Sequence, residues 1–261
     1  MTAPVAQPAF GTLLRQWRER RRTSQLDLAI ETGVSARHVS FVETGRSQPS
    51  RDMVLRLAEQ LDVPLRERNV LLLSAGYAPA YPMRTLDDEE MTPVRDALEK
   101  ILDGYRPYPA LVVDRGWNLV AANSSVSVLT GGADADLLEP PVNVLRLSLH
   151  PRGVAPAIRN LAQWRGHILH RLAREVAVTA DSDLAALHRE LLDYPGGTEQ
   201  AQDNALAVPL RLQVDDHELA FFSTVTTFGT AVDVTLAELS IEAFLPANEP
   251  TAQALRRLSA E

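Results

Sequence analysis

Residues 24–43 read SQLDLAIETGVSARHVSFVE, and this stretch decides the fold of the first part of the chain. Ser24 and Ser35 are placed to cap two short helices, because a serine hydroxyl can accept a hydrogen bond from a backbone N–H of the first turn. Gly33 ends the first of these helices. Apolar residues stand where the helices would cross and pack inward, namely Leu28, Ala29, Val34, Val39 and Val42. Two short helices with this pattern and a glycine turn predict a helix-turn-helix.

Helical spacing continues on both sides of this stretch. An earlier helix has apolar residues from Phe10 to Trp17 on one face. A fourth helix can be capped by Ser50, and a fifth can begin at Pro64, since proline suits the first turn. We therefore expect an all-α DNA-binding domain over residues 1–80.

The remainder of the chain has a different character. Residues 81–92 are expected to form a linker, and residues 93–261 a second domain of the α+β class. Within this domain a long helical stretch runs from about Val154 to Val178, and another helix follows Asp181.

Alternating apolar residues in the second domain predict two β-hairpins. The first pairs residues 110–114 with 117–123 across an Arg-Gly turn, and the second pairs residues 206–214 with 217–228. Residues 233–245 are ambiguous, because their leucine spacing fits a helix while their β-branched residues favour a strand.

Charge is distributed unevenly along the chain. The net charge is −8, yet residues 1–85 hold 12 arginines and 8 acidic residues, whereas residues 86–261 hold 14 basic and 26 acidic residues. Only the first part is therefore suited to phosphate. There is no cysteine, which excludes disulfides and thiolate metal sites. No apolar run approaches the ~18 residues that span a bilayer. We expect a cytoplasmic protein with no membrane partner.

The second helix of the motif supplies the candidate DNA contacts. It projects Ala36, Arg37, Ser40 and Phe41 outward, where base edges would lie in a major groove. Arg37 can donate to guanine O6 and N7. Further candidates stand at helix ends or beyond the motif and can meet phosphate, namely Gln25, Ser35, Arg46 and Arg51.

Two alternatives accompany this interpretation. A plain helical bundle would also contain short helices with a glycine turn, although the local positive charge favours DNA. Phe41 either touches a thymine methyl or packs under the loop of residues 44–50, and the pattern does not decide between them.

Other patterns point to no enzyme and no metal site. His167 and His170 share a helix face but lack a third ligand nearby, and Asp134 and Asp136 lack the later glutamate of a calcium loop. The chain contains none of the common phosphate-binding or hydrolase motifs. We expect no catalytic residues, no metal and no cofactor beyond a bound ligand.

The residues from Ser24 to Pro79 resemble the XRE-type, phage-repressor-like DNA-binding domain. The run RHVSFVETGRSQPSR at 37–51 is typical of MmyB-like transcription regulators, and the resemblance continues through YPALVVDRGWNLVAAN, NLAQWRGHILHRL, VPLRL and FFSTVTTFGTAVDVTLAELSIEAFLP. It implies a PAS-like C-terminal domain that binds a small apolar molecule, with fatty acids as the leading class. It also implies that residues 233–245 form a strand.

A ligand site in that domain has several candidate residues. Trp117, Trp164 and Phe221 are candidate walls, with simple core packing as the alternative. Arg171, helped by Asn160, is the candidate partner for a ligand carboxylate, because an unpaired buried charge is costly; a surface role is the alternative. Asn123 follows a strand and either caps the next helix, which we favour, or orients a ligand head group.

These features together predict a transcription regulator that binds double-stranded operator DNA. We expect a homodimer, because one recognition helix covers only half of a typical operator. The second domain is expected to bind a small apolar, fatty-acid-like ligand. The alternative is a C-terminal domain that only dimerises or binds a protein partner. An apolar cavity of ~300–1,000 Å³ would favour the sensor, and a filled core would favour the alternative.

Overall fold

The computed structural model describes residues 9–199 and 207–259. The chain divides into two compact units, Met1–Arg84 with Ala231–Val234, and Thr85–Thr230 with Thr235–Glu261. The first unit thus includes a short segment from late in the chain, which the sequence did not indicate.

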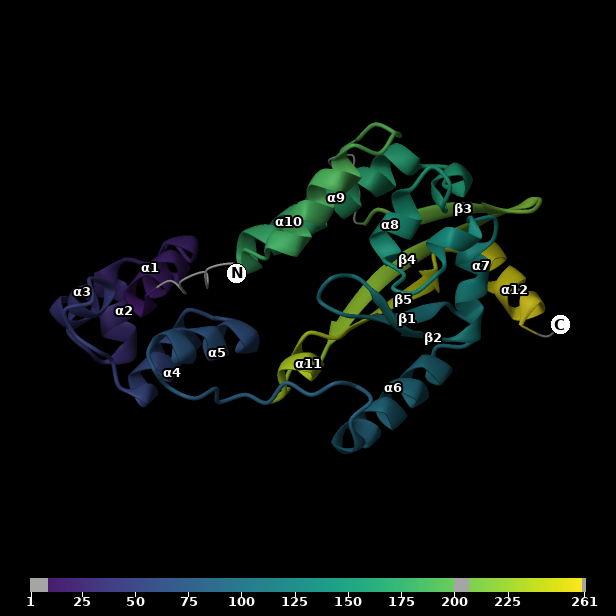
Figure 1. Ribbon diagram of the computed structural model, residues 1–261. Helices are drawn as coiled ribbons and strands as arrows, with labels where there is room; N and C mark the ends of the chain where they lie inside the picture. The colour runs from purple at the N-terminus through teal and green to yellow at the C-terminus, as the bar shows by residue number, and fades with distance from the viewer. Residues whose placement is uncertain (1–8, 200–206, 260–261) are drawn as a thin grey trace, which may run out of the picture. The chain divides into compact units, whose positions relative to one another are not determined.

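The described part of the first unit contains the five predicted helices (Figure 1). They are α1 (Phe10–Arg20), α2 (Gln25–Thr32), α3 (Ala36–Glu43), α4 (Arg51–Gln60) and α5 (Leu65–Ser74). The hydroxyls of Ser24, Ser35 and Ser50 each accept a hydrogen bond from the backbone N–H three residues later, which confirms the predicted caps. Gly33 has a φ of +70° between α2 and α3, in the left-handed region that favours glycine.

Leucines from four helices form the centre of this unit. Leu14, Leu28, Leu57 and Leu72 are fully buried and come from α1, α2, α4 and α5. The inward face of α3 packs on the same core through valines. Burial of this shared core fixes α3 against α2, so the helix-turn-helix is held rigidly by the domain around it.

The second unit is an α+β domain, as predicted. Its sheet consists of β1 (Ala110–Val113), β2 (Leu119–Ala122), β3 (Leu210–Val214), β4 (His217–Thr227) and β5 (Ser240–Pro246). The strand order is β2-β1-β5-β4-β3, and all neighbours are antiparallel. Both predicted hairpins are present, β1–β2 and β3–β4, although Leu206 at the start of the second prediction lies outside the described residues.

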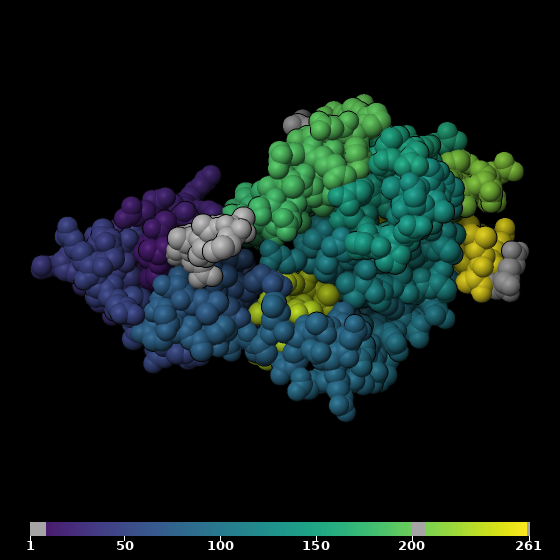
Figure 2. All heavy atoms as spheres, viewed as in Figure 1, coloured from purple at the N-terminus to yellow at the C-terminus, as the bar shows by residue number. Residues whose placement is uncertain are grey.

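The other elements from residue 89 onward are helices and short 3-10 turns. They are η1 (Glu89–Met91), α6 (Thr92–Gly104), η2 (Ser124–Val126), α7 (Ser127–Thr130), η3 (Ala135–Leu137), α8 (Val144–Leu149), η4 (Ala155–Ala157), α9 (Leu161–Thr179), α10 (Ser182–Leu192), α11 (Val234–Ala237) and α12 (Glu249–Leu258). In Figure 2 the green atoms of α9 and α10 pack against the teal atoms of the α7–α8 segment.

The interior strand β1 is buried on both faces because helices lie on each side of the sheet (Figure 1). Leu111 and Val113 pack into the larger core, to which α9 contributes. Ala110 and Val112 belong to a smaller cluster with the leucines of α6. The alternation of side chains along β1 thus separates a thin core under α6 from a thick core under α8 and α9.

Residues 233–245 correct one expectation. The family resemblance implied a single strand, but Val234–Ala237 form α11 and only Ser240–Pro246 form β5. The i, i+3 spacing of Leu236 and Leu239 fits the helical turn at the start of this segment, and both leucines pack in the cluster beside α6. The long predicted helix also starts later than Val154, because residues 155–157 form a separate 3-10 turn before α9.

Candidate functional site

The surface around α3 carries two arginines beside one aromatic ring. Arg37 on α3 and Arg46 in the following turn are both exposed. Their guanidinium carbons lie 5.1 and 5.9 Å from the centroid of the Phe41 ring. Phe41 is half-buried and lies outside the core cluster that the described residues of this unit form. Two cations and an apolar ring on one surface suit a major groove, where phosphates, guanine edges and thymine methyls are accessible.

Four other candidate DNA contacts stand on α3 or at the start of α3 and α4. Ser35 caps α3, Ala36 and Ser40 are half-buried on α3, and Arg51 is exposed at the start of α4. Their contacts with DNA remain predictions.

Sequence reasoning missed a buried carboxylate at the end of α3. The side chain of Glu43 has no exposed surface. Arg18 donates from Nε to Glu43 Oε1 at 2.6 Å and from Nη2 to Oε2 at 3.1 Å. Arg15 Nε and Gln25 Nε2 donate to the same Oε2 at 3.4 and 2.7 Å. Glu43 stands four residues after inward-facing Val39, and this helical spacing was the signal that could have revealed it.

Glu43 joins three helices because its carboxylate stays ionised. Burial alone would raise the pKa of Glu43, but hydrogen bonds from Arg18 and Gln25, with the charge of Arg18, hold that pKa below its ordinary value. Gln25 was predicted to contact phosphate. Its side chain donates to Glu43 and so helps to position α3. A phosphate contact from Gln25 remains a prediction.

The second unit contains an apolar cavity of about 240 Å³ between the sheet and the α7–α9 region. Fourteen of the 18 lining residues are apolar, among them Leu111, Leu145 and Phe244. The volume lies slightly below the ~300–1,000 Å³ usual for ligand sites, yet it exceeds the ~150 Å³ of a cavity that binds benzene. The thick core is therefore not fully filled by its own side chains.

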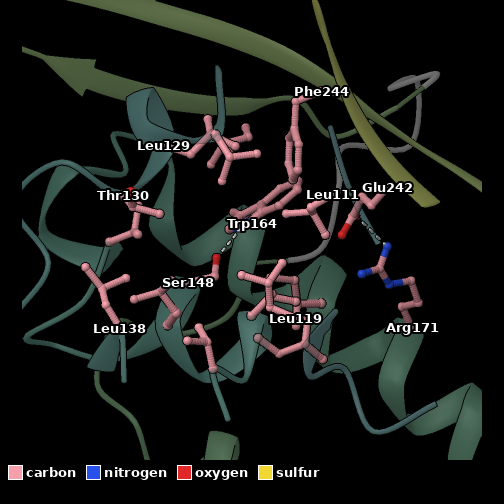
Figure 3. A pocket seen from close by; sticks show the side chains of 18 residues that line it. Leu111, Leu119, Leu129, Thr130, Leu138, Ser148, Trp164, Arg171, Glu242 and Phe244 are labelled. Carbon is pink, nitrogen blue, oxygen red and sulfur yellow. Dashed lines mark hydrogen bonds and ion pairs between the residues drawn. The ribbon is translucent and has the colours of Figure 1, made fainter. Parts of the chain in front are cut away.

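The four polar lining residues are Thr130, Ser148, Arg171 and Glu242. Figure 3 shows Arg171 and Glu242 together at one side of the lining, with Thr130 at the opposite side. Arg171 Nη1 donates to Glu242 Oε1 at 3.1 Å. Ser148 Oγ accepts from Trp164 Nε1 at 3.1 Å. Charge is thus concentrated at one end of an otherwise apolar space.

Two of the six predicted ligand residues line the cavity, Trp164 and Arg171. Trp117 lies next to them, because the Arg171 guanidinium carbon is 4.2 Å from the centroid of the Trp117 ring. Phe221 is fully buried in the core and meets Phe244 edge-on at 6.4 Å between ring centroids. Phe244, Leu111 and Glu242 are lining residues that sequence reasoning missed, since sheet pairing brings them together.

The two predicted asparagines serve the fold rather than the lining. Asn123 Oδ1 accepts from the Ala110 N–H, and its Nδ2 donates to the carbonyls of Leu102 and Tyr108. The favoured helix-cap role of Asn123 is wrong, because its side chain makes no cap hydrogen bond.

Asn160, expected to help Arg171, instead ties the start of α9 to the first residues of β3 and the residue before it. Its Nδ2 donates to the Pro209 carbonyl at 2.8 Å, and its Oδ1 accepts from the Arg211 N–H at 3.1 Å.

Three residues that sequence reasoning rejected as metal ligands, Asp134, Asp136 and His167, contact other side chains. Asp134 and Asp136 accept hydrogen bonds from Arg152, and His167 stacks on Trp164 at 5.6 Å between centroids. In the part of the chain that the structure describes, no group of three or more potential ligands is placed to hold a metal ion. Nor does any helix there have the length and apolarity to cross a membrane.

Comparison with known proteins gives both units a counterpart. Residues 94–258 match the MmyB-like transcription regulator ligand binding domain, and residues 9–71 match a helix-turn-helix domain. The chain is 31% identical over 116 residues to the HTH-type transcriptional regulator RghRB of Bacillus subtilis, covering 44% of this chain and 75% of that protein.

A second relative and a solved structure are more distant. The chain is 29% identical over 133 residues to the HTH-type transcriptional regulator Rv0023 of Mycobacterium tuberculosis, covering 51% of this chain and 45% of that protein. The match thus spans about half the length of this mycobacterial relative. The clp gene regulator ClgR from Corynebacterium glutamicum covers 39% of this chain and 99% of its own, at 20% identity and a TM-score of 0.24. From the family matches over both units, the chain belongs to the MmyB-like transcription regulators, with a helix-turn-helix followed by a ligand-binding domain.

Proposed function

We propose that this regulator binds operator DNA through α3 and changes its DNA affinity when a small molecule with an alkyl chain, such as a fatty-acid derivative, enters the C-terminal cavity. The single observation that carries the proposal is the cavity of about 240 Å³, lined by 14 apolar residues, within the domain that matches a ligand-binding family. An apolar chain gains free energy on transfer from water to such a lining.

The proposal includes a homodimer acting in the cytoplasm, without catalytic activity. Two copies of α3 would read two half-sites about 34 Å apart. The acidic second domain repels DNA and is therefore the natural place for a contact between copies. The PAS-like description of this domain rests on the family resemblance.

The test begins with the protein as purified. Native mass spectrometry should find a dimer carrying a bound lipid, and extraction with organic solvent should release that lipid. The stripped full-length chain is then titrated with alkyl alcohols of increasing length while its affinity for a selected operator is followed. A protein that carries no lipid, binds no alkyl compound and shows unchanged DNA affinity would leave the second domain as a dimerisation or partner-binding module.

A further inference from the structure

We propose that the cavity selects an alkyl ligand whose head group carries no negative charge, such as an alcohol or a primary amide, over the corresponding carboxylate. This inference rests on the proposed function, because it concerns the head group of a molecule whose chain fills the cavity. It departs from the sequence-based expectation that Arg171 pairs with a ligand carboxylate.

Arg171 already has an anionic partner within the protein. Its Nη1 donates to Glu242 Oε1 at 3.1 Å, and the side chain of Glu242 is only 5% exposed. The hydroxyl of Ser223 donates to the same oxygen at 2.5 Å, which holds the carboxylate in place. The positive charge that would attract a ligand carboxylate is therefore neutralised by Glu242.

The face of the same guanidinium is also covered. Its carbon lies 4.2 Å from the centroid of the Trp117 ring, a distance typical of a cation–π contact. Trp117 Nε1 in turn donates to Glu175 Oε2 at 2.8 Å. The Glu175 carboxylate is thus hydrogen-bonded to the same Trp117 ring against which the Arg171 guanidinium packs.

The lining that the described residues form contains no further cation beside Arg171 to pair with a ligand carboxylate. Among the described residues that line the cavity, Arg171 is the only basic one. The neighbouring His167 does not supply a charge at neutral pH, because burial and the charge of Arg171 lower its pKa. A ligand carboxylate would therefore be a second anion beside the single lining cation, in a largely apolar space where unpaired charge is costly.

A neutral head group fits this end of the cavity better. It places no additional negative charge beside the Arg171–Glu242 ion pair, so the cost of bringing a second carboxylate into a largely apolar space does not arise. The alkyl chain gains the same burial with either head group.

The experiment compares decan-1-ol, decanamide and decanoate on the stripped full-length protein by isothermal titration at about pH 7.5. The alcohol and amide should bind about tenfold or more tightly than decanoate, because the added anion meets like charge. Glu242→Gln keeps the shape of the side chain but releases the charge of Arg171, so this variant should gain affinity for decanoate and lose the discrimination.

Glu218→Gln is the matched control, because Glu218 pairs with Arg211 at 2.7 Å on the same sheet and does not line the cavity. It should keep the wild-type ranking. Equal or tighter binding of decanoate by the wild type, or an unchanged ranking in Glu242→Gln, overturns the head-group inference alone. Failure of all three probes to bind the wild type overturns the proposed function as well.

Discussion

Arg18 and Glu43 form a two-pronged ion pair between the first helix and the end of the recognition helix, with N–O distances of 2.6 and 3.1 Å. The carboxylate is fully buried, while Arg18 is 12% exposed. The orientation of α3 therefore depends on a charge that is held away from solvent.

Replacement of Glu43 should destabilise the DNA-binding unit. Glu43→Ala should cost about 3 kcal/mol in the free energy of unfolding, because it leaves Arg18 without its buried partner. Glu19→Ala, at an exposed neighbour of Arg18, should change stability by less than about 0.5 kcal/mol. Chemical denaturation followed by circular dichroism measures both. Equal stability of the two variants would contradict the positioning role.

The same pair should make stability depend on pH. Because the pKa of Glu43 is lowered in the folded state, its stabilising contribution is present above the unfolded value of 4.5 and is lost as pH falls through the folded pKa. The stability difference between wild type and Glu43→Gln should therefore shrink below about pH 4.5. A difference that stays constant between pH 7 and pH 3 would argue against an ionised Glu43.

Arg37 and Arg51 should contribute to DNA binding in different ways. Arg37→Ala should relax base choice and cost about 1–3 kcal/mol, since it removes a candidate guanine contact. Arg51→Ala should weaken binding to all sequences alike and reduce the salt slope by about 1, as expected for a phosphate contact. Fluorescence anisotropy with specific and scrambled duplexes at several salt concentrations distinguishes the two. If both variants weakened binding to the specific and the scrambled duplex equally, Arg37 would not contact a base.

The Asn123→Ala variant should have a lower free energy of unfolding but should keep the wild-type ligand preference. The buried amide joins β1 to the end of α6 through three hydrogen bonds, so its loss should cost about 2–3 kcal/mol. Ser124→Ala, at the exposed next residue, is the control and should be near neutral. A change in the ranking of alkyl head groups in Asn123→Ala would restore the ligand role considered from the sequence.

Glu175→Gln should stabilise the second domain at neutral pH. Burial raises the pKa of Glu175, so its ionised form is less favourable in the folded than in the unfolded state. The gain in Tm should be largest above the raised folded pKa and should vanish below the unfolded value of 4.5, where the wild-type group is neutral in both states. Glu99→Gln on the exposed face of α6 should show no such dependence. A lower Tm at neutral pH for Glu175→Gln would contradict a destabilising effect of the ionised Glu175 carboxylate.

Local features of this chain could be predicted from sequence because their partners lie within a few residues. The serine caps at Ser24, Ser35 and Ser50 need only the following turn of helix, and the β1–β2 and β3–β4 hairpins need only a short turn between alternating strands. The helix-turn-helix belongs to this class, as its defining contacts fall within residues 24–43.

The site residues that were missed have distant partners. Glu242 stands 71 positions from Arg171, and Glu43 stands 25 positions from Arg18. The spacing from Val39 indicates that Glu43 faces inward, but nothing in the sequence indicates which residue either carboxylate pairs with. Asn123 was misread for the same reason, because its three partners precede it by 13 to 21 positions. Nor can composition distinguish an apolar wall from a filled core, since both need the same leucines and aromatic residues.

Leu145 and Leu187 provide the most direct test that the cavity is the ligand site. Both are buried in the same core, but only Leu145 lines the cavity. Phenylalanine at position 145 should occupy the space meant for the ligand, whereas at position 187 it should only strain the packing of α10.

The measurement is isothermal titration of decan-1-ol into the stripped full-length wild type, Leu145→Phe and Leu187→Phe. Leu145→Phe should lose about tenfold or more in affinity, equivalent to ~1.4 kcal/mol, while Leu187→Phe should bind within about threefold of wild type. Binding by Leu145→Phe that matches the wild type, or no binding by the wild type itself, would contradict a ligand site in this cavity.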